Sequence, residues 1–132
     1  MTGHTGFKGA WLALWLARMG ARVHGFAAAP PSAPSLYELA SVSSVLDDEE
    51  IGDVRSFTDD GAYDVVIHMA AQALVRRSLV DPAETWEVNV GGTARVLASG
   101  AARGASAVLV VTSDKCYRDV SSGHPMREDD AL

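Results

Sequence analysis

Three glycines near the start of the chain, Gly3, Gly6 and Gly9, are spaced three residues apart, and an apolar helical pattern follows them at once. Glycine lets a backbone turn tightly and approach a ligand closely, and the first N–H groups of a helix carry a partial positive charge. A glycine turn that opens a helix therefore suits the pyrophosphate of a dinucleotide. The spacing alone also fits a tight turn without a ligand. Such a turn normally follows a buried strand, whereas only Met1 and Thr2 precede it here.

Helical and strand patterns alternate along the rest of the chain. The sequence predicts helices over residues 8–19, 36–41 and 82–102, and strands over residues 22–26, 51–54, 64–69 and 107–112. Gly20 ends the first helix, and Ser35 with Glu38 forms a capping box for the second. A loop over 27–34, an acidic turn over 47–50, one helical turn over 56–60 and an irregular stretch over 113–132 complete the prediction. Strands that alternate with helices predict an α/β fold with a parallel sheet and right-handed crossovers.

The apolar content of these elements predicts how they pack. The helix over 8–19 is apolar on nearly all sides, which favours burial against a sheet. The strands over 64–69 and 107–112 contain unbroken apolar runs, which are typical of strands covered on both faces. Gly91 and Gly92 weaken the middle of the long helix, so we expect close packing or a bend there.

Length, charge and cysteine content exclude several classes of protein. The 132 residues suffice for one domain, and a net charge of −6 argues against a nucleic-acid partner. A lone cysteine, Cys116, permits no internal disulfide, so a reducing cytoplasm is the simplest compartment. No signal-peptide pattern and no apolar run long enough for a bilayer are present, so we expect no membrane partner. No metal is expected, because His68 has no second ligand at a suitable spacing.

Four segments fall where a parallel sheet binds its ligands, at the carboxyl ends of the strands. They are the glycine turn, Asp53–Val54, Ala70–Gln72 and Ser113–Lys115. Their convergence strengthens the prediction of a nucleotide site beyond what the glycines alone support.

Five motifs, in this order, resemble the extended short-chain dehydrogenase/reductase family. They are TGHTGFKG at 2–9, GDVR at 52–55, HMAAQ at 68–72, NVGGT at 89–93 and TSDKCY at 112–117. Within the family the likeness is greatest to sugar-nucleotide 4,6-dehydratases with CDP-glucose as substrate, through His4, Lys8 and residues 30–36, 71–78 and 113–116. The resemblance implies a Rossmann-type doubly wound parallel sheet and an NAD cofactor.

The resemblance also implies which residues hold NAD. Gly3, Thr5, Gly6, Phe7 and Gly9 would lie at the pyrophosphate, Asp53 and Val54 at the adenine, and Ala70, Ala71 and Gln72 along the ribose and nicotinamide. For Asp53 the alternative is simple turn chemistry. NAD rather than NADP rests on the resemblance alone, because neither an acidic residue nor an arginine stands at 26–29.

Three further residues would act on the sugar. In the family reaction a hydride passes from C4 to NAD, water is lost across C5 and C6, and the hydride returns to C6. By resemblance, Ser113 would bond near the 4-hydroxyl, while Asp114 and Lys115 would carry out the elimination. A carboxylic acid can protonate the departing hydroxyl, and a lysine can act as a base only if its pKa is depressed. The alternative is a surface ion pair between Asp114 and Lys115.

Two departures from the family pattern predict an incomplete Rossmann domain over 1–132, with the first strand and the C-terminal part missing. The family's Tyr-x-x-x-Lys pair is absent, because Tyr37, Tyr63 and Tyr117 are followed four residues later by Ser41, Ile67 and Ser121. We therefore expect this fragment alone to be inactive. We also expect a gap or a rearrangement where the strand before the glycine turn belongs.

Several functional hypotheses remain open from the sequence. The leading one is a fragment of a cytoplasmic, homo-oligomeric dehydratase that makes deoxysugars for O-antigen or lipopolysaccharide. The alternatives are an epimerase or reductase of the same superfamily, and a non-catalytic nucleotide-binding remnant. Side chains expected to have no ligand role are Lys8 as a solvated residue, His4 in a loop, His68 packed at a strand end and Cys116 as a buried filler.

Overall fold

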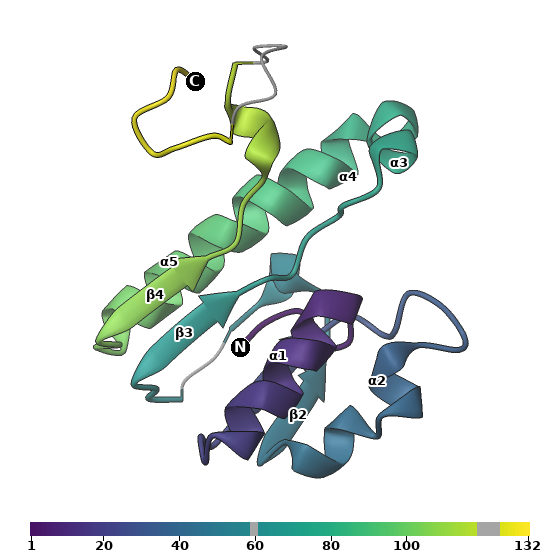
Figure 1. Cartoon of the computed structure of the whole chain (residues 1–132), viewed down its shortest axis with the longest axis vertical. Coiled ribbons are helices and arrows are strands. Elements are labelled where there is room, and N and C mark those ends of the chain that lie inside the picture. Colours follow the sequence, from purple (N-terminus) through teal and green to yellow (C-terminus); the bar gives the residue numbers. More distant parts are fainter. Residues whose placement is uncertain (59–60, 119–124) are drawn as a thin grey trace.

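A computed structural model describes residues 1–58, 61–118 and 125–132, without the side chain of Asp114. The strands are β1 (His24–Ala27), β2 (Asp48–Ile51), β3 (Val65–His68) and β4 (Ala107–Val110). The α-helices are α1 (Phe7–Arg18), α2 (Leu36–Leu39), α3 (Val75–Val80), α4 (Pro82–Trp86) and α5 (Thr93–Ala102). Short 3₁₀ turns occur at Val42–Val45, Val54–Ser56 and Asp114–Cys116, and a π-helical turn at Glu87–Gly92 joins α4 to α5. The expected α/β class is confirmed (Figure 1).

The strands form two parallel pairs that the start of the chain connects. β1 pairs with β2 from His24 opposite Asp48, and β3 pairs with β4 from Val65 opposite Ala107. Thr2 forms parallel bridges to both β1 and β3. In Figure 1 the N-terminus accordingly lies between β3 and the part of the molecule that contains α1.

The backbone hydrogen bonds of the first three residues make this connection. The Phe26 N–H donates to the Met1 carbonyl at 2.9 Å, and the Gly3 N–H donates to the Phe26 carbonyl at 2.8 Å. On the other side the Thr2 N–H donates to the Ile67 carbonyl at 2.9 Å. Residues 1–3 therefore occupy the last positions of a central parallel strand between β1 and β3.

A cavity of about 360 Å³ lies where that central strand would begin. Its lining includes Met1, Thr2, His24, Gly25, Val65 and Val66. Alternate residues of a strand pair with opposite neighbours, and Ile67 bonds to Thr2, so Val65 directs its backbone groups toward the cavity. The expected gap is therefore confirmed.

Helix α1 begins and ends where the sequence predicts, but its expected burial is wrong. Gly20 follows it in the left-handed region at φ +87°. Only its small residues, Gly9, Ala10 and Ala13, are buried, and the two alanines pack against Val42. The large side chains one turn apart remain 57–71% exposed, namely Phe7, Trp11, Trp15 and Met19. The buried face of α1 is made of small residues because these let its backbone approach the neighbouring segment closely.

The region between β1 and β3 confirms one prediction and corrects two. The capping box of Ser35 and Glu38 is present and starts α2. The acidic run over 47–50 is mostly strand rather than turn, because it pairs with β1. Asp48 and Glu50 are exposed, whereas Glu49 is half-buried. The expected strand over 51–54 is accordingly wrong. The expected helical turn over 56–60 begins earlier, at Val54, and residues 59–60 lie outside the described part.

The long helix over 82–102 is present but contains the π-helical turn at its glycines. A Cβ on Gly92 would lie 2.6 Å from a Val54 methyl, so close packing is confirmed there, whereas Gly91 faces open space. Helix α3 escapes sequence analysis because its six residues show no clear period. Full burial of β3 and β4 is also wrong, since Val65 and Leu109 are more than half exposed.

Two apolar clusters stabilise the fold. One contains Phe26, Val54, Phe57 and Val96, and the other contains Ala10, Ala13 and Val42. The first anchors α5 and the second anchors α1. Among the described residues, no helix combines the length and the apolar character that crossing a membrane requires.

The cavity predicts that an extended apolar segment fused ahead of Met1 stabilises the protein. Four added residues of Val and Ile can extend the pairing of residues 1–3 along β1 and β3 and bury apolar surface. We expect the free energy of unfolding to rise by about 2 kcal/mol or more, measured by urea denaturation. A Gly-Ser extension of equal length is the control, and equal stabilities for the two fusions would contradict the prediction.

Candidate functional site

The glycine turn is held by contacts of its own backbone. Gly3 has φ +82°, and a Cβ there would lie 2.8 Å from the Ala70 nitrogen. A Cβ on Gly9 would lie 2.0 Å from the Gly3 carbonyl oxygen. Gly6 has an ordinary φ of −75°, and a Cβ there would meet nothing nearer than the Gly3 oxygen at 3.4 Å. Packing therefore requires Gly3 and Gly9, whereas Gly6 leaves room on the open side of the turn.

Helix α1 starts at this turn with its N-terminal N–H groups uncapped by any side chain. Gly6 is the N-cap, no side chain caps the helix, and its first turn has no acidic residue. The Thr5 hydroxyl donates to the Ala28 carbonyl at 2.8 Å and ties the turn to the end of β1. Phe7, the first residue of α1, is 71% exposed. Such a helix start attracts an anion such as a phosphate.

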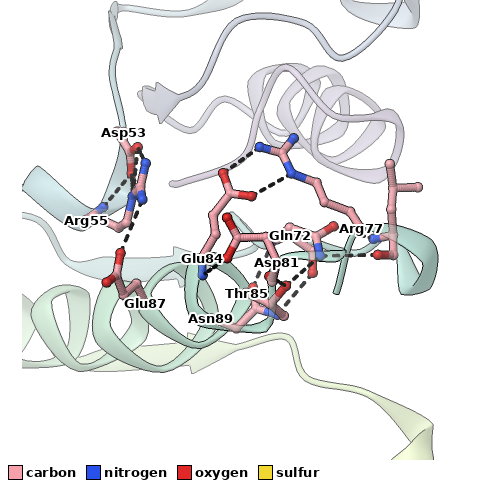
Figure 2. A network of polar contacts seen from close by, with 10 residues as sticks. Asp53, Arg55, Gln72, Arg77, Asp81, Glu84, Thr85, Glu87 and Asn89 are labelled. Atoms are coloured by element: carbon pink, nitrogen blue, oxygen red, sulfur yellow. Dashed lines mark hydrogen bonds and ion pairs between the residues drawn. The ribbon is translucent and has the colours of Figure 1, made fainter. Parts of the chain in front are cut away.

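The segment Ala70–Gln72 packs directly beside the glycine turn. The Ala70 N–H donates to the Thr2 hydroxyl at 3.1 Å. The Gln72 N–H donates to Asn89 Oδ1 at 2.8 Å, and Asn89 Nδ2 donates back to the Gln72 carbonyl at 3.0 Å (Figure 2). Gln72 Nε2 also donates to the Thr85 hydroxyl at 2.9 Å. These hydrogen bonds connect the glycine turn with the end of β3. They also connect the end of β3 with helix α4 and the π-helical turn that follows it.

Asp53 and Val54 lie at the 3₁₀ turn that follows β2. Asp53 accepts a hydrogen bond from the Arg55 N–H at 2.8 Å and pairs with the Arg55 guanidinium at 2.6 Å. Arg55 also reaches Glu87 at 3.3 Å (Figure 2). Hydrogen bonds from Arg55 lower the pKa of Asp53. This geometry favours the turn-chemistry alternative for Asp53, and Val54 is only 5% exposed.

Residues Ser113–Lys115 follow β4 at the same edge of the sheet. The Val111 N–H donates to the His68 carbonyl at 3.0 Å and keeps the chain beside the end of β3. The Ser113 hydroxyl accepts a hydrogen bond from the Lys115 N–H at 3.1 Å. The side chain of Asp114 lies outside the described part. Cys116 is exposed, so its expected role as a buried filler is wrong.

His4 lies in a turn, in agreement with the expected loop position, and its side chain is fully buried. Its Nε2 lies 3.0 Å from Glu49, which also accepts hydrogen bonds from the hydroxyls of Tyr37 and Ser43. Burial lowers the pKa of His4 and outweighs the opposing effect of Glu49. Burial also opposes ionisation of Glu49, but its three hydrogen-bond donors prevail and lower its pKa. No sequence pattern marks this cluster.

His68 packs at a strand end, as the sequence predicts. It is 2% exposed, and its two ring nitrogens lie 2.7 Å from the Thr2 hydroxyl and 2.9 Å from the Thr93 hydroxyl. Burial lowers its pKa. Within residues 1–58, 61–118 and 125–132, no group of three His, Cys, Asp or Glu side chains could hold a metal ion.

Comparison with known proteins identifies relatives along the whole sequence. The profile of the NAD dependent epimerase/dehydratase family matches residues 1–132. A CDP-glucose 4,6-dehydratase of Salmonella typhimurium is 45% identical in an alignment of 124 residues that covers 89% of this chain and 34% of that protein. The chain therefore spans about a third of the length of this relative.

Two solved structures are similar in fold. A UDP-glucose-4-epimerase from Stenotrophomonas maltophila, with bound NAD and formylated UDP-arabinopyranose, has a TM-score of 0.82 at 21% identity. MoeE5, in complex with UDP-glucose and NAD, has a TM-score of 0.77 at 27% identity. Each match covers 98% of this chain and 40% of the other. The Rossmann-type architecture is thereby confirmed.

The two buried histidines predict that stability falls in mild acid. Burial lowers the pKa of both His4 and His68, so below about pH 6.5 the unfolded chain binds more protons than the folded one. We expect the free energy of unfolding to be nearly constant between pH 8 and 7. Toward pH 5 it should fall by at most about 1.4 kcal/mol per pH unit for each histidine.

Urea denaturation at a series of pH values measures this dependence. His68→Gln should make the dependence shallower, because it removes one of the two groups. Stability that is unchanged between pH 7 and 5, or that rises, would contradict neutral burial of the two rings.

Proposed function

Because the chain belongs to the NAD-dependent epimerase/dehydratase family, we propose that residues 1–132 are the NAD-binding part of a sugar-nucleotide 4,6-dehydratase that acts on CDP-glucose. The observation that carries the proposal is the contact between the glycine turn and Ala70–Gln72, beside the uncapped start of α1. The 45% identity to the dehydratase from Salmonella supports the choice of reaction.

The residues at the turn suit NAD. The open side of Gly6 admits a pyrophosphate close to the backbone, and the uncapped N–H groups of α1 donate to its oxygens. Ala70 and Ala71 offer small side chains where the ribose and nicotinamide would lie, and Gln72 is fixed beside them by Asn89. When bound, NAD supplies a hydride acceptor for C4 of the sugar and a hydride donor for C6.

The proposed adenine contact must accommodate the ion pair between Asp53 and Arg55. Asp53 would accept a hydrogen bond from the adenine amino group while it remains paired with Arg55, and Val54 would line the ring through its backbone. A carboxylate has about four acceptor positions, so one can serve the adenine. The choice of NAD over NADP rests on family likeness.

Ser113, Asp114 and Lys115 are the proposed catalytic residues. Ser113 lies exposed beyond β4, where its hydroxyl can bond near the 4-hydroxyl of the sugar. Asp114 would protonate the departing 6-hydroxyl, and Lys115 would take the C5 proton. An elimination of water needs an acid at the departing hydroxyl and a base at the carbon that loses its proton. A simple epimerase needs no such pair, which favours the dehydratase over that alternative.

Turnover is not expected from these residues alone. The family removes the proton of the 4-hydroxyl with the tyrosine of a Tyr-x-x-x-Lys pair, and the 132 residues contain no such pair. We propose that they bind the cofactor without completing the reaction, as a non-catalytic nucleotide-binding remnant would also do. For the dehydratase itself we propose a cytoplasmic homo-oligomer that supplies deoxysugars for O-antigen or lipopolysaccharide.

A single methyl group at Gly6 tests the cofactor site. Gly6→Ala should fold normally, because its backbone is in an extended conformation and the added Cβ meets nothing nearer than 3.4 Å. The methyl should obstruct the pyrophosphate and weaken NAD binding at least tenfold, or about 1.4 kcal/mol. Isothermal titration calorimetry with NAD measures the affinity.

Gly91→Ala is the matched control, because Gly91 faces open space in the π-helical turn. It should bind NAD as the unchanged protein does. Equal affinities of the Gly6 and Gly91 variants, or no binding by the unchanged protein, would overturn the proposed site.

A further inference from the structure

His68 uses both ring nitrogens inside the protein. Its Nδ1 lies 2.7 Å from the Thr2 hydroxyl, and its Nε2 lies 2.9 Å from the Thr93 hydroxyl. Both His68 and Thr2 are 2% exposed, so water does not compete for these bonds. The ring therefore spans the sheet from the start of the chain to the first residue of α5.

The neighbours of Thr2 and Thr93 fix the direction of the first bond. The Thr2 hydroxyl accepts the Ala70 N–H at 3.1 Å, and it shares the Met69 N–H, at 3.1 Å, with the Thr2 carbonyl, at 3.2 Å. At the other nitrogen, the Thr93 hydroxyl spends its one hydrogen on the Asn89 carbonyl, so it accepts a hydrogen bond from His68 Nε2. The neutral ring then leaves Nδ1 to accept the hydrogen of the Thr2 hydroxyl. That nitrogen is then an acceptor and carries no proton.

With this assignment the bonds all run in one direction. The neutral imidazole carries its proton on Nε2 and donates it to the Thr93 hydroxyl. The Thr93 hydroxyl in turn donates to the Asn89 carbonyl at 2.6 Å. The result is a one-way chain of hydrogen bonds from the amides of Met69 and Ala70, through Thr2, His68 and Thr93, to Asn89.

Both ends of this chain hold the same segment. At one end Thr2 binds the Ala70 amide, where a Cβ on Gly3 would already be only 2.8 Å from the nitrogen. At the other end the chain reaches the backbone carbonyl of Asn89, and the side chain of the same residue holds the Gln72 backbone with two hydrogen bonds of 2.8 and 3.0 Å (Figure 2). The position of Ala70–Gln72 therefore depends on a ring that contacts neither Gln72 nor the glycines by a described hydrogen bond.

We propose that His68 is a positioning residue: as the neutral Nε2–H tautomer it couples Thr2 to Thr93 and holds Ala70–Gln72 against the glycine turn. The coupling follows from the geometry alone. Its consequence for NAD affinity rests on the proposed function. A second proton on the ring would place a third N–H against the Thr2 hydroxyl oxygen, which already faces the N–H groups of Met69 and Ala70, so the coupling requires the neutral ring.

The tautomer is tested directly on the unchanged protein. Long-range ¹H–¹⁵N correlation spectra at neutral pH should show His68 with an unprotonated Nδ1 and a protonated Nε2. The opposite tautomer, or a doubly protonated ring, would overturn the proposal. This measurement needs no variant and no ligand.

The coupling is tested with a matched pair of substitutions. Thr93→Val keeps the shape of the side chain but removes the hydroxyl, whereas Thr93→Ser keeps the hydroxyl. We expect amide hydrogen exchange at Ala70 and Gln72 to accelerate at least tenfold in the valine variant and to stay near its original rate in the serine variant. Equal rates in the two variants would overturn the coupling.

NAD titration of the same proteins separates the two proposals. If the unchanged protein binds NAD, the valine variant should bind it at least fivefold more weakly, and serine should restore the affinity. Unchanged affinity in the valine variant would overturn the positioning role of His68. If the unchanged protein does not bind NAD, the proposed function fails, while the tautomer and the exchange rates still decide whether His68 couples the two segments.

Discussion

Met1, Thr2 and Gly3 pair by backbone hydrogen bonds with both halves of the sheet, and the arrangement of the site depends on this pairing. Among the described residues, the strands form two separate pairs, and Thr2 bridges β1 to β3. The same residues lead into the glycine turn, so the sheet and the turn are positioned together. The cavity beside them lies between β1 and β3 and is lined by Met1, Thr2, His24 and Val65.

The second constraint is the distance between backbones at the carboxyl edge of the sheet. Gly3 lies against Met69 and Ala70, and Gly9 lies against Gly3, closer than any side chain would allow. Buried polar groups then complete the arrangement, since Thr2, His68 and Thr93 pair with one another and Asn89 holds Gln72. The surface that faces a ligand is made of backbone and small residues, while the side chains that fix it lie underneath.

Sequence analysis succeeded where one local pattern determines the structure. The glycine turn, the capping box at Ser35 and the alternation of strands and helices all have short-range causes, and they are found in the structure. It failed where burial depends on partners far along the chain. The aromatic residues of α1 are exposed because alanines make the contact, and the acidic run at 47–50 forms a strand because β1 lies beside it.

The sequence predicted which segments form the site, but it did not predict which buried side chains hold those segments in place. Placing Gly3 and Ala70 at one edge follows from the rule that parallel strands present their carboxyl ends together. The support from His4, His68 and Asn89 was not predictable, because the partners of these side chains lie far along the chain, although packing of His68 at a strand end was expected. The pairing of Asp53 with Arg55 was likewise not predicted, because the sequence indicated only that Asp53 follows a strand.

The central claim is that the glycine turn and the segment after β3 form one nucleotide site, built around residues 1–3. The most direct measurement is an amide ¹H–¹⁵N NMR titration of the protein with NAD. The account predicts that the largest shifts cluster at Gly3–Gly9 and at Ala70–Gln72, and that both groups saturate at the same concentration. Shifts confined to one of the two segments, or centred on the cavity between β1 and β3, would contradict it.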